Sequence, residues 1–189
     1  MARARHFSNV IAFDDAPFAR AHRGRVLVVG VVFARTRLDG VLTATVQRDG
    51  ADATRVLSAL VTGSRFHSHV QAVLFQGIAV AGFNVIDIHA LYGAIARPVL
   101  VVARRPPDMR AIERALQSVR GGARKWRLIE RAGPMERIGR VLVQRAGLDL
   151  EEARRLLEGL TIQGAIPEPL RAAHLIAGGV TTGVSRGRA

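Results

Sequence analysis

Cysteine is absent from the 189 residues of this chain. Its absence excludes disulfide bonds, cysteine-ligated zinc, iron–sulfur clusters and thiol catalysis, and it is typical of a cytoplasmic protein. No apolar stretch reaches the length of a membrane span without charges, and the N-terminal MARARHFSN lacks the apolar segment of a secretory signal. We therefore expect a cytoplasmic protein that does not contact a membrane.

Acidic residues, lysine and aromatic residues are all scarce. Lys and Arg number 28 against 15 Asp and Glu, a net charge of +13, and Lys125 is the one lysine. A guanidinium group is a planar fork that matches phosphate, so this excess favours a polyanionic partner, DNA or RNA. A GC-rich genome explains the arginine bias equally well, although the charge remains. Aromatic residues make up only 5%, so a stacking platform for single strands is not obvious.

Apolar residues are plentiful, at 49%, and together with the length they favour one globular domain over residues 1–189. Hydrophobic periodicity and turn residues predict the order of elements along this domain. The expected strands are 10–13, 24–36, 41–48, 70–75, 99–103 and 137–147, with a turn at 38–40. The first expected helix starts after Asp52, and four more cover 82–96, 106–119, 148–160 and 166–180. Residues 121–127 are expected to form a basic loop.

A strand and a hairpin followed by alternating helices and strands predict an α/β fold, with a mixed sheet and helices on both faces. This order matches the ribonuclease H-like architecture. Ligands of such sheets gather near the carboxyl ends of strands. Asp14 and Asp15 follow the first strand, and Gln76-Gly77 follows the fourth, so both pairs are candidates for a site.

Paired carboxylates at strand ends are how nucleases hold Mg²⁺, a hard cation that prefers oxygen ligands. The candidates are Asp14, Asp15, Asp49, Asp52 and Asp87. Adjacent residues of a strand face opposite sides, so at most one of Asp14 and Asp15 should enter the main cluster if the strand continues that far. Each acid also has a structural interpretation: a turn for the first three, a helix cap for Asp52, and an ordinary solvent-facing residue for Asp87.

The stretch GIAVAGFN (77–84) could form a pocket for a base, since Gly77 and Gly82 allow close approach and Asn84 can pair with a base edge. It is equally a glycine-eased turn from strand to helix. In the predicted helix, Asn84 and Asp87 share one face. Arg104 and Arg105 follow a buried strand, where they could grip phosphate or simply be solvated.

Seven stretches lie in order over nearly the whole chain: AFDDAPF, VVGVVF, RDGADAT, QGIAVAGFNVIDI, RPVLVVARRPPD, AGLDLEEAR and IPEPLRAAHLIAGGVTTGVSRGRA. Together they resemble the endonuclease dU family, which is largely uncharacterised, mostly archaeal and named for a proposed activity at deoxyuridine. That family in turn resembles endonuclease V, a ribonuclease H-fold enzyme that nicks nucleic acid beside deaminated bases using Mg²⁺.

The resemblance to endonuclease V implies roles for several residues. Asp14 matches the first metal-binding Asp, Asp52 takes the position of the metal-binding Glu, and Arg104 takes the place of a functional Lys. PEPLRAAH (167–174) resembles the closing-helix motif, which places Arg171 and His174 at the nucleic acid.

The resemblance breaks at two points. Endonuclease V has a metal-binding Asp followed by Gly after its fourth strand, whereas this chain has Gln76-Gly77, and glutamine offers only a neutral oxygen. Asp15 or Asp87 could supply the missing carboxylate. The aromatic wedge that opens the strands in endonuclease V also has no clear counterpart here.

The sequence thus predicts a Mg²⁺- or Mn²⁺-dependent endonuclease that acts near uracil or hypoxanthine in DNA repair. Asp14, Asp52 and Arg104 are its predicted catalytic residues. Asp14 and Asp52 would converge on the metal, with Asp15, Asp87 and Gln76 as further ligands. The alternatives are a catalytically impaired nucleic-acid-binding protein that keeps the fold, and a small-molecule or regulatory protein. The oligomeric state is not predicted.

Overall fold

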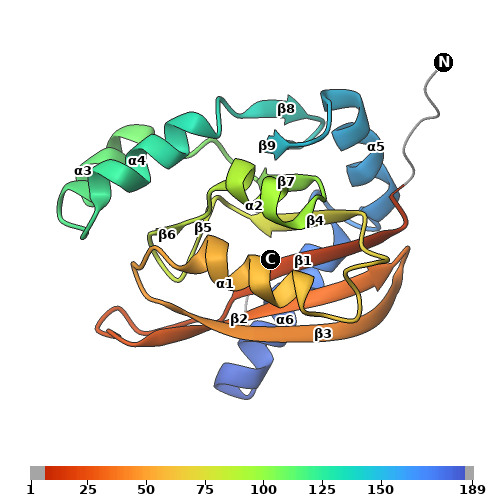
Figure 1. The fold of residues 1–189 in the computed structure, drawn as a ribbon, viewed down its shortest axis with the longest axis horizontal. Coiled ribbons are helices and arrows are strands. Elements are labelled where there is room, and N and C mark those ends of the chain that lie inside the picture. The colour runs from red at the N-terminus through yellow and green to blue at the C-terminus, as the bar shows by residue number, and fades with distance from the viewer. Residues whose placement is uncertain (1–6, 186–189) are drawn as a thin grey trace.

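The computed structural model describes residues 7–185, so the ends of the chain, including most of the terminal SRGRA, lie outside it. A seven-stranded mixed sheet runs through the described part in the order β3-β2-β1-β4-β7-β9-β8 (Figure 1). Its strands are β1 (Asn9–Asp15), β2 (Arg25–Ala34), β3 (Arg37–Gln47), β4 (Ala72–Gln76), β7 (Val99–Ala103), β8 (Glu136–Ile138) and β9 (Val141–Ala146). A separate hairpin consists of β5 (Ala79–Val80) and β6 (Asn84–Val85).

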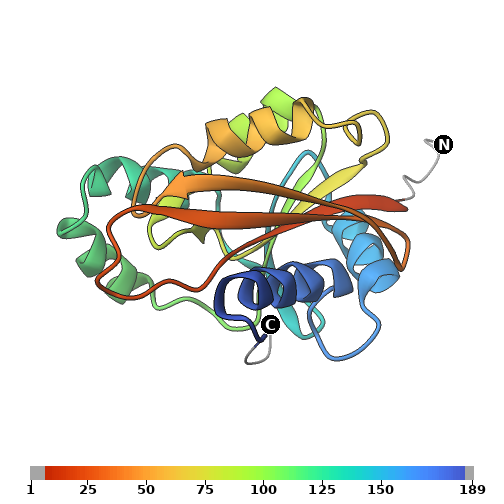
Figure 2. The same cartoon turned by 90° about the horizontal axis from the view of Figure 1, so that it is seen from below.

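Helices cover both faces of the sheet, which confirms the predicted fold class (Figure 2). Their bounds are α1 (Ala53–Thr62), α2 (Ile88–Ile95), α3 (Met109–Gln117), α4 (Gly122–Arg131), α5 (Leu150–Leu160) and α6 (Glu168–Thr182). Alternate residues of the central strands pack in two cores, one under α1 and α2 and the other under α5 and α6. Within the described residues, no helix is long and apolar enough to cross a membrane.

The first hairpin turns earlier than the sequence predicts. β3 begins at Arg37, so the expected turn at 38–40 is wrong, and the chain reverses near Arg35, whose φ is 57°. Gly40 serves packing instead, because a Cβ at this position would overlap the ring of Phe66. The glycine was therefore a misleading turn signal.

Three further segments differ from the prediction. The expected helix 82–96 is wrong in its first half, because Ala81 and Gly82 both have positive φ and turn the chain between β5 and β6. The expected loop 121–127 is wrong as well, since Gly121 caps α4 in a left-handed conformation. The expected strand 137–147 is two strands, because Gly139, with φ of 55°, ends β8.

Phe13 of β1 and Phe75 of β4 fix the centre of the sheet. They are register partners in the parallel β1–β4 pair, and their rings stack at 5.5 Å with both side chains fully buried. Gly30 of β2 pairs with Phe13 from the other side. A Cβ on Gly30 would overlap the Phe13 ring, so glycine at this position leaves the ring its space.

Gly30→Ala should lower the free energy of unfolding by about 1–3 kcal/mol, because the added methyl overpacks the ring stack beneath the site. Gly93→Ala is the matched control, since a Cβ there meets nothing within 4 Å and α2 gains a better helix former. That variant should gain roughly 0.5–1 kcal/mol. Urea denaturation measures both, and equal effects of the two substitutions would contradict this account of the core.

Candidate functional site

The site begins with the register of β1 and β4. Phe13 is the partner of Phe75, so the next residues along the two parallel strands are Asp14 and Gln76. Both continue the face that Ala12 and Leu74 present to α6. An acid and an amide therefore lie on neighbouring strand ends, on the same side of the sheet, as their positions in the sequence predict.

His174 of α6 lies against this pair. The helix packs on the sheet through its buried apolar stripe, Leu170, Ala173 and Ala177, and this packing carries His174 to the end of β1. Its Nδ1 is 2.8 Å from Oδ2 of Asp14, across 160 residues of sequence. The other oxygen of Asp14 accepts a hydrogen bond of 3.0 Å from the backbone N–H of Asp15. The histidine thus orients the Asp14 carboxylate.

Asp15 is also part of the site, although it extends the other face of β1. Its Oδ2 accepts a hydrogen bond of 3.0 Å from the N–H of Ala81, in the turn between β5 and β6. β1 continues through Asp15, and both acids line one pocket at its end. Whether one or both of them enter a metal cluster stays a prediction.

The shared pocket, which we call the carboxylate pocket, has a volume of about 520 Å³. Its lining consists of Asp14, Asp15, Ala16, Pro17, Phe18, Gln76, His174, Gly178 and Thr182. Oε1 of Gln76 is buried and has no hydrogen-bond partner among residues 7–185. A buried amide oxygen without a donor is costly, so this atom is available to a ligand that accepts an oxygen lone pair.

Burial dominates the electrostatics of the pocket. It raises the pKa of Asp14, while the hydrogen bond and the charge of His174 act in the opposite direction. Burial, followed by repulsion from Asp14, raises the pKa of Asp15 to about 6. Two adjacent buried carboxylates are difficult to ionise together, and a bound cation would remove this difficulty.

The residues present fit one hard cation. Two carboxylates and the unpartnered oxygen of Gln76 are the ligand types that Mg²⁺ and Mn²⁺ accept. The fit is to a sparse site, however: no group of three or more His, Asp or Glu in the part of the chain that the structure describes could hold a metal ion.

Asp52 lies outside the carboxylate pocket. Its Oδ1 accepts hydrogen bonds from the N–H of Gln47 at 3.1 Å and from Nδ2 of Asn84 at 2.7 Å, and Arg25 lies 3.5 Å from Oδ2. The structure therefore does not bring Asp52 to Asp14, and the prediction that these two acids share one metal ion is wrong. Asp52 occupies the N-cap position of α1, but its side chain makes no capping bond.

Asn84 and Asp87 also have structural partners. Asn84 is fully buried, and its amide bonds the N–H of Ala53, the carbonyl of Gln47 and Asp52, which leaves no group for the edge of a base. Asp87 caps α2 by accepting from the N–H of Ala90 and pairs with Arg131 at 2.7 Å. The predicted shared helix face is wrong, since Asn84 belongs to β6.

The remaining predicted nucleic-acid contacts are spread over the surface. Gly77, with φ of 81°, ends β4 beside the carboxylate pocket, whereas Gly82 lines a different cleft. Arg104 and Arg105 are exposed just beyond β7, the neighbour of β4. Arg171 is exposed on α6 and pairs with Glu168 at 2.5 Å.

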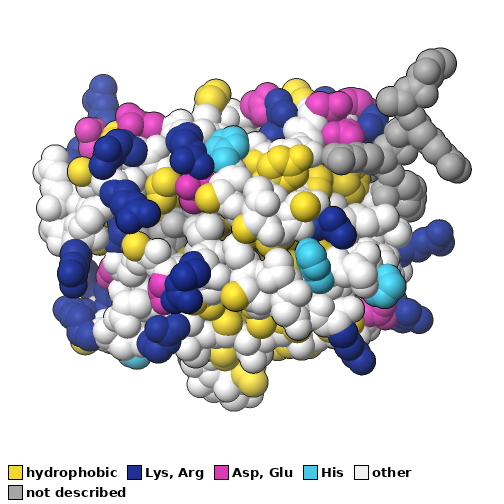
Figure 3. All heavy atoms as spheres, viewed as in Figure 1, with side chains coloured by type: hydrophobic (Ala, Val, Ile, Leu, Met, Phe, Trp, Pro, Cys, Tyr) yellow, Lys and Arg dark blue, Asp and Glu magenta, His cyan; other side chains and the backbone are white. Residues whose placement is uncertain are grey.

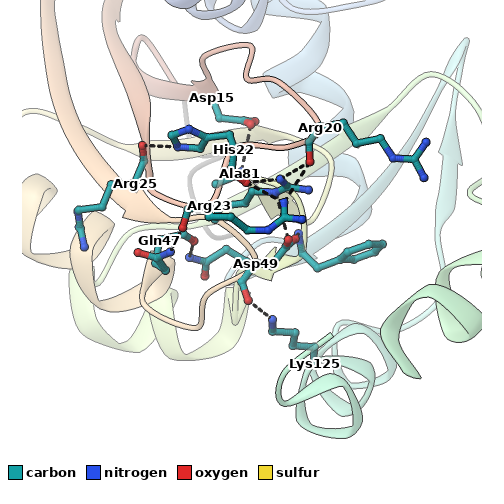
Figure 4. Close-up of polar contacts among 12 residues, drawn as sticks. Asp15, Arg20, His22, Arg23, Arg25, Gln47, Asp49, Ala81 and Lys125 are labelled. Carbon is teal, nitrogen blue, oxygen red and sulfur yellow. Dashed lines mark hydrogen bonds and ion pairs between the residues drawn. The ribbon is translucent and has the colours of Figure 1, made fainter. Parts of the chain in front are cut away.

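A second group is centred on Asp49, which the sequence offers as a metal ligand or as a turn residue but not as the centre of a group. Oδ1 of Asp49 accepts from the N–H of Phe83 at 2.8 Å, and its Oδ2 lies 3.2 Å from Arg48. Its carbonyl accepts from Lys125, which points from α4 toward it (Figure 4). Lys125 is buried, and burial lowers its pKa. The signal for this group was the single lysine in an arginine-rich chain.

The amino-acid sequence is similar to one protein family and to several known proteins. The model of a family described as Endonuclease dU matches residues 6–181. A UPF0215 protein of Deinococcus radiodurans is 56% identical over 182 residues, which cover 96% of this chain and 93% of the relative.

One solved structure supports the same relation, and endonuclease V shares the fold. A crystal structure of a protein of unknown function from Archaeoglobus fulgidus is 33% identical, covers 92% of this chain and 98% of its own, and has a TM-score of 0.87. Ciona intestinalis endonuclease V, in complex with an inosine-containing DNA, has a TM-score of 0.58 at 14% identity, with coverage of 88% and 83%. The second likeness shows a shared fold. With a match over nearly its whole length, the chain belongs to the Endonuclease dU family.

Proposed function

We propose that this protein is a Mg²⁺- or Mn²⁺-dependent endonuclease that nicks DNA or RNA near deaminated bases, uracil or hypoxanthine, in the repair of DNA. One observation carries the proposal: Asp14, Asp15 and the unpartnered oxygen of Gln76 share one pocket at the strand ends of an endonuclease V-like fold. The basic composition suits a substrate with a phosphate backbone.

Residues in and near the carboxylate pocket would have different roles in this reaction. Asp14, Asp15 and Gln76 would hold the cation, and when bound it would supply positive charge near the phosphate and lower the pKa of water. His174 keeps the Asp14 carboxylate in one orientation through the contact at 2.8 Å. Arg104 lies just beyond β7, the neighbour of β4 in the sheet, and its guanidinium would neutralise charge that develops on the phosphate. Asp52 and Asp87 have no part in this mechanism.

A second candidate is a nucleic-acid-binding protein that keeps the nuclease fold without cleavage. The sparse ligand set favours it, because Gln76 replaces a charged ligand by a neutral one and Asp52 is bound elsewhere. This candidate predicts salt-sensitive binding of strands without any Mg²⁺-dependent product.

Asp14→Ala should abolish nicking while leaving the affinity for nucleic acid nearly intact, because the substitution removes a metal ligand and not a phosphate contact. The assay incubates labelled strands that carry uracil, inosine or normal bases with Mg²⁺ or with chelator, and scores retention and cutting separately. Glu158→Gln, an exposed residue of α5, is the matched control. Nicking by Asp14→Ala at the wild-type rate would refute the role of Asp14, and binding without cutting by the wild-type protein would select the second candidate.

Gln76→Asp should bind Mn²⁺ more tightly than wild type by roughly tenfold, because affinity for a hard cation rises with the number of charged oxygen ligands. Asp52→Asn should leave Mn²⁺ affinity unchanged, since Asp52 lies outside the pocket. Calorimetric titration of the three proteins measures this difference without reference to activity. Weaker binding by Asp52→Asn, or no gain in Gln76→Asp, would contradict this ligand set.

The affinity for Mn²⁺ should fall as the pH decreases through about 6. Asp15 is the reason, since its pKa in the metal-free protein is raised to about 6, so below that pH a proton occupies a ligand oxygen. Titrations at a series of pH values test this. Asp15→Asn should bind more weakly at high pH and lose the part of the decline centred near pH 6. A wild-type profile that declines only near the ordinary pKa of an aspartate, about 4, would exclude Asp15 as a ligand.

A further inference from the structure

We propose that a second hollow, the arginine cleft, binds the phosphate backbone of a single-stranded stretch of nucleic acid. The cleft has a volume of about 1130 Å³, which exceeds the size of most small-ligand pockets and suits an extended ligand. Its lining residues are Arg20, Arg23, Gln47, Arg48, Asp49, Gly50, Ala51, Gly82, Phe83, Ala115, Ser118, Val119, Arg120 and Gly121. The proposal rests on the proposed function only in naming nucleic acid as the ligand.

The charge of the cleft is positive and comes from separate parts of the chain. Arg20 and Arg23 lie on the loop 16–24, Arg48 follows β3, and Arg120 lies in the turn between α3 and α4. Asp49 is the one acid of the lining, and its carboxylate is already engaged by Arg48 and by the N–H of Phe83. A wall with this excess of guanidinium groups attracts phosphate.

Two of the four arginines are free to meet a ligand. Arg48 is committed to the protein, since it donates to the carbonyls of Arg20 and His22 and lies 5.4 Å over the ring of Phe18. Arg23 also donates to the carbonyls of Arg20 and His22. The exposed side chains of Arg20 and Arg120 make no hydrogen bond or ion pair with residues 7–185.

The rest of the lining suits a strand of nucleic acid. Phe83, Ala115 and Val119 add apolar surface between the arginines, which gives a base something to pack on while the phosphates meet the guanidinium groups. Figure 3 shows Lys and Arg side chains gathered at the same end of the molecule, over α3 and α4. The cleft is therefore the hollow part of a larger basic surface.

The cleft adjoins the carboxylate pocket. Ala16, Pro17 and Phe18 line the pocket and Arg20 and Arg23 line the cleft, so the loop 16–24 separates the two hollows. Ala81 links them below the loop: its N–H donates to Asp15, and its carbonyl accepts from the N–H of Asp49 at 2.9 Å. Figure 4 shows Arg20 and Arg23 of this loop above Asp49. A strand held in the cleft would lie next to the acids.

The experiment compares two double variants that each remove two positive charges. R20Q/R120Q removes the free guanidinium groups of the cleft. R35Q/R65Q removes two exposed arginines near the opposite end of β1. There the backbone N–H of Arg35 donates to the carbonyl of Ser8, and Arg65 lines a hollow together with Asn9. The probe is a fluorescein-labelled oligothymidine, with oligouridine of equal length as a second arm. Fluorescence anisotropy gives the affinity over a range of salt concentrations, with chelator present.

R20Q/R120Q should weaken binding roughly tenfold at low salt and reduce the slope of log affinity against log salt by about 1.4, since each phosphate contact with a single strand contributes about 0.7. R35Q/R65Q should bind like wild type. Equal losses in the two double variants, or no loss in either, would overturn the proposal. Binding in chelator requires no cleavage, so a protein that binds through the cleft but never nicks would refute the endonuclease alone. The two arms show whether the strand is DNA or RNA.

Discussion

The pairing of β1 with β4 is the constraint on which the site depends. Both strands are buried on both faces, and the Phe13–Phe75 stack fixes their register. Each strand changes from apolar to polar at the next residue, so Asp14 and Gln76 must lie side by side where the sheet reaches solvent. A shift of one residue in this register would turn one of the two side chains to the opposite face of the sheet and separate it from the other. Burial of the strands therefore creates the site and also raises the pKa of its acids.

Polar groups near the site add hydrogen bonds to the apolar packing that joins the β5–β6 hairpin to the helices around it. Asp49 connects the end of β3 to the β5–β6 hairpin through Phe83 and to α4 through Lys125. Asn84 and Asp52 form a second buried connection between β6 and the start of α1. Asp49 and Asp52, which the sequence made candidates for metal binding, a turn or a helix cap, thus have structural partners. Their bonds hold Gln47 and Phe83, which line the arginine cleft.

Much of the sheet could be predicted from sequence, because the strands are apolar runs with clear ends. The same signal placed Asp14, Asp15 and Gln76 at strand ends, and the structure brings them into one pocket. It could not separate a ligand from a scaffold acid, since Asp52 has the same spacing from its helix in either role. The β5–β6 hairpin was missed because the expected helix 82–96 begins at Gly82, and Ala81, the other turn residue, with φ of 50°, carries no turn signature.

The backbone of Ala81 forms hydrogen bonds on the side of both hollows, to Asp15 and to Asp49. The N–H of Ala81 donates to Asp15 and its carbonyl accepts from the N–H of Asp49, so the two contacts belong to the two peptide planes that meet at this residue. Rotation of this residue changes both contacts at once. A ligand that displaced Ala81 from one hollow would alter the contact on the other side as well, and such a coupling would act equally in both directions.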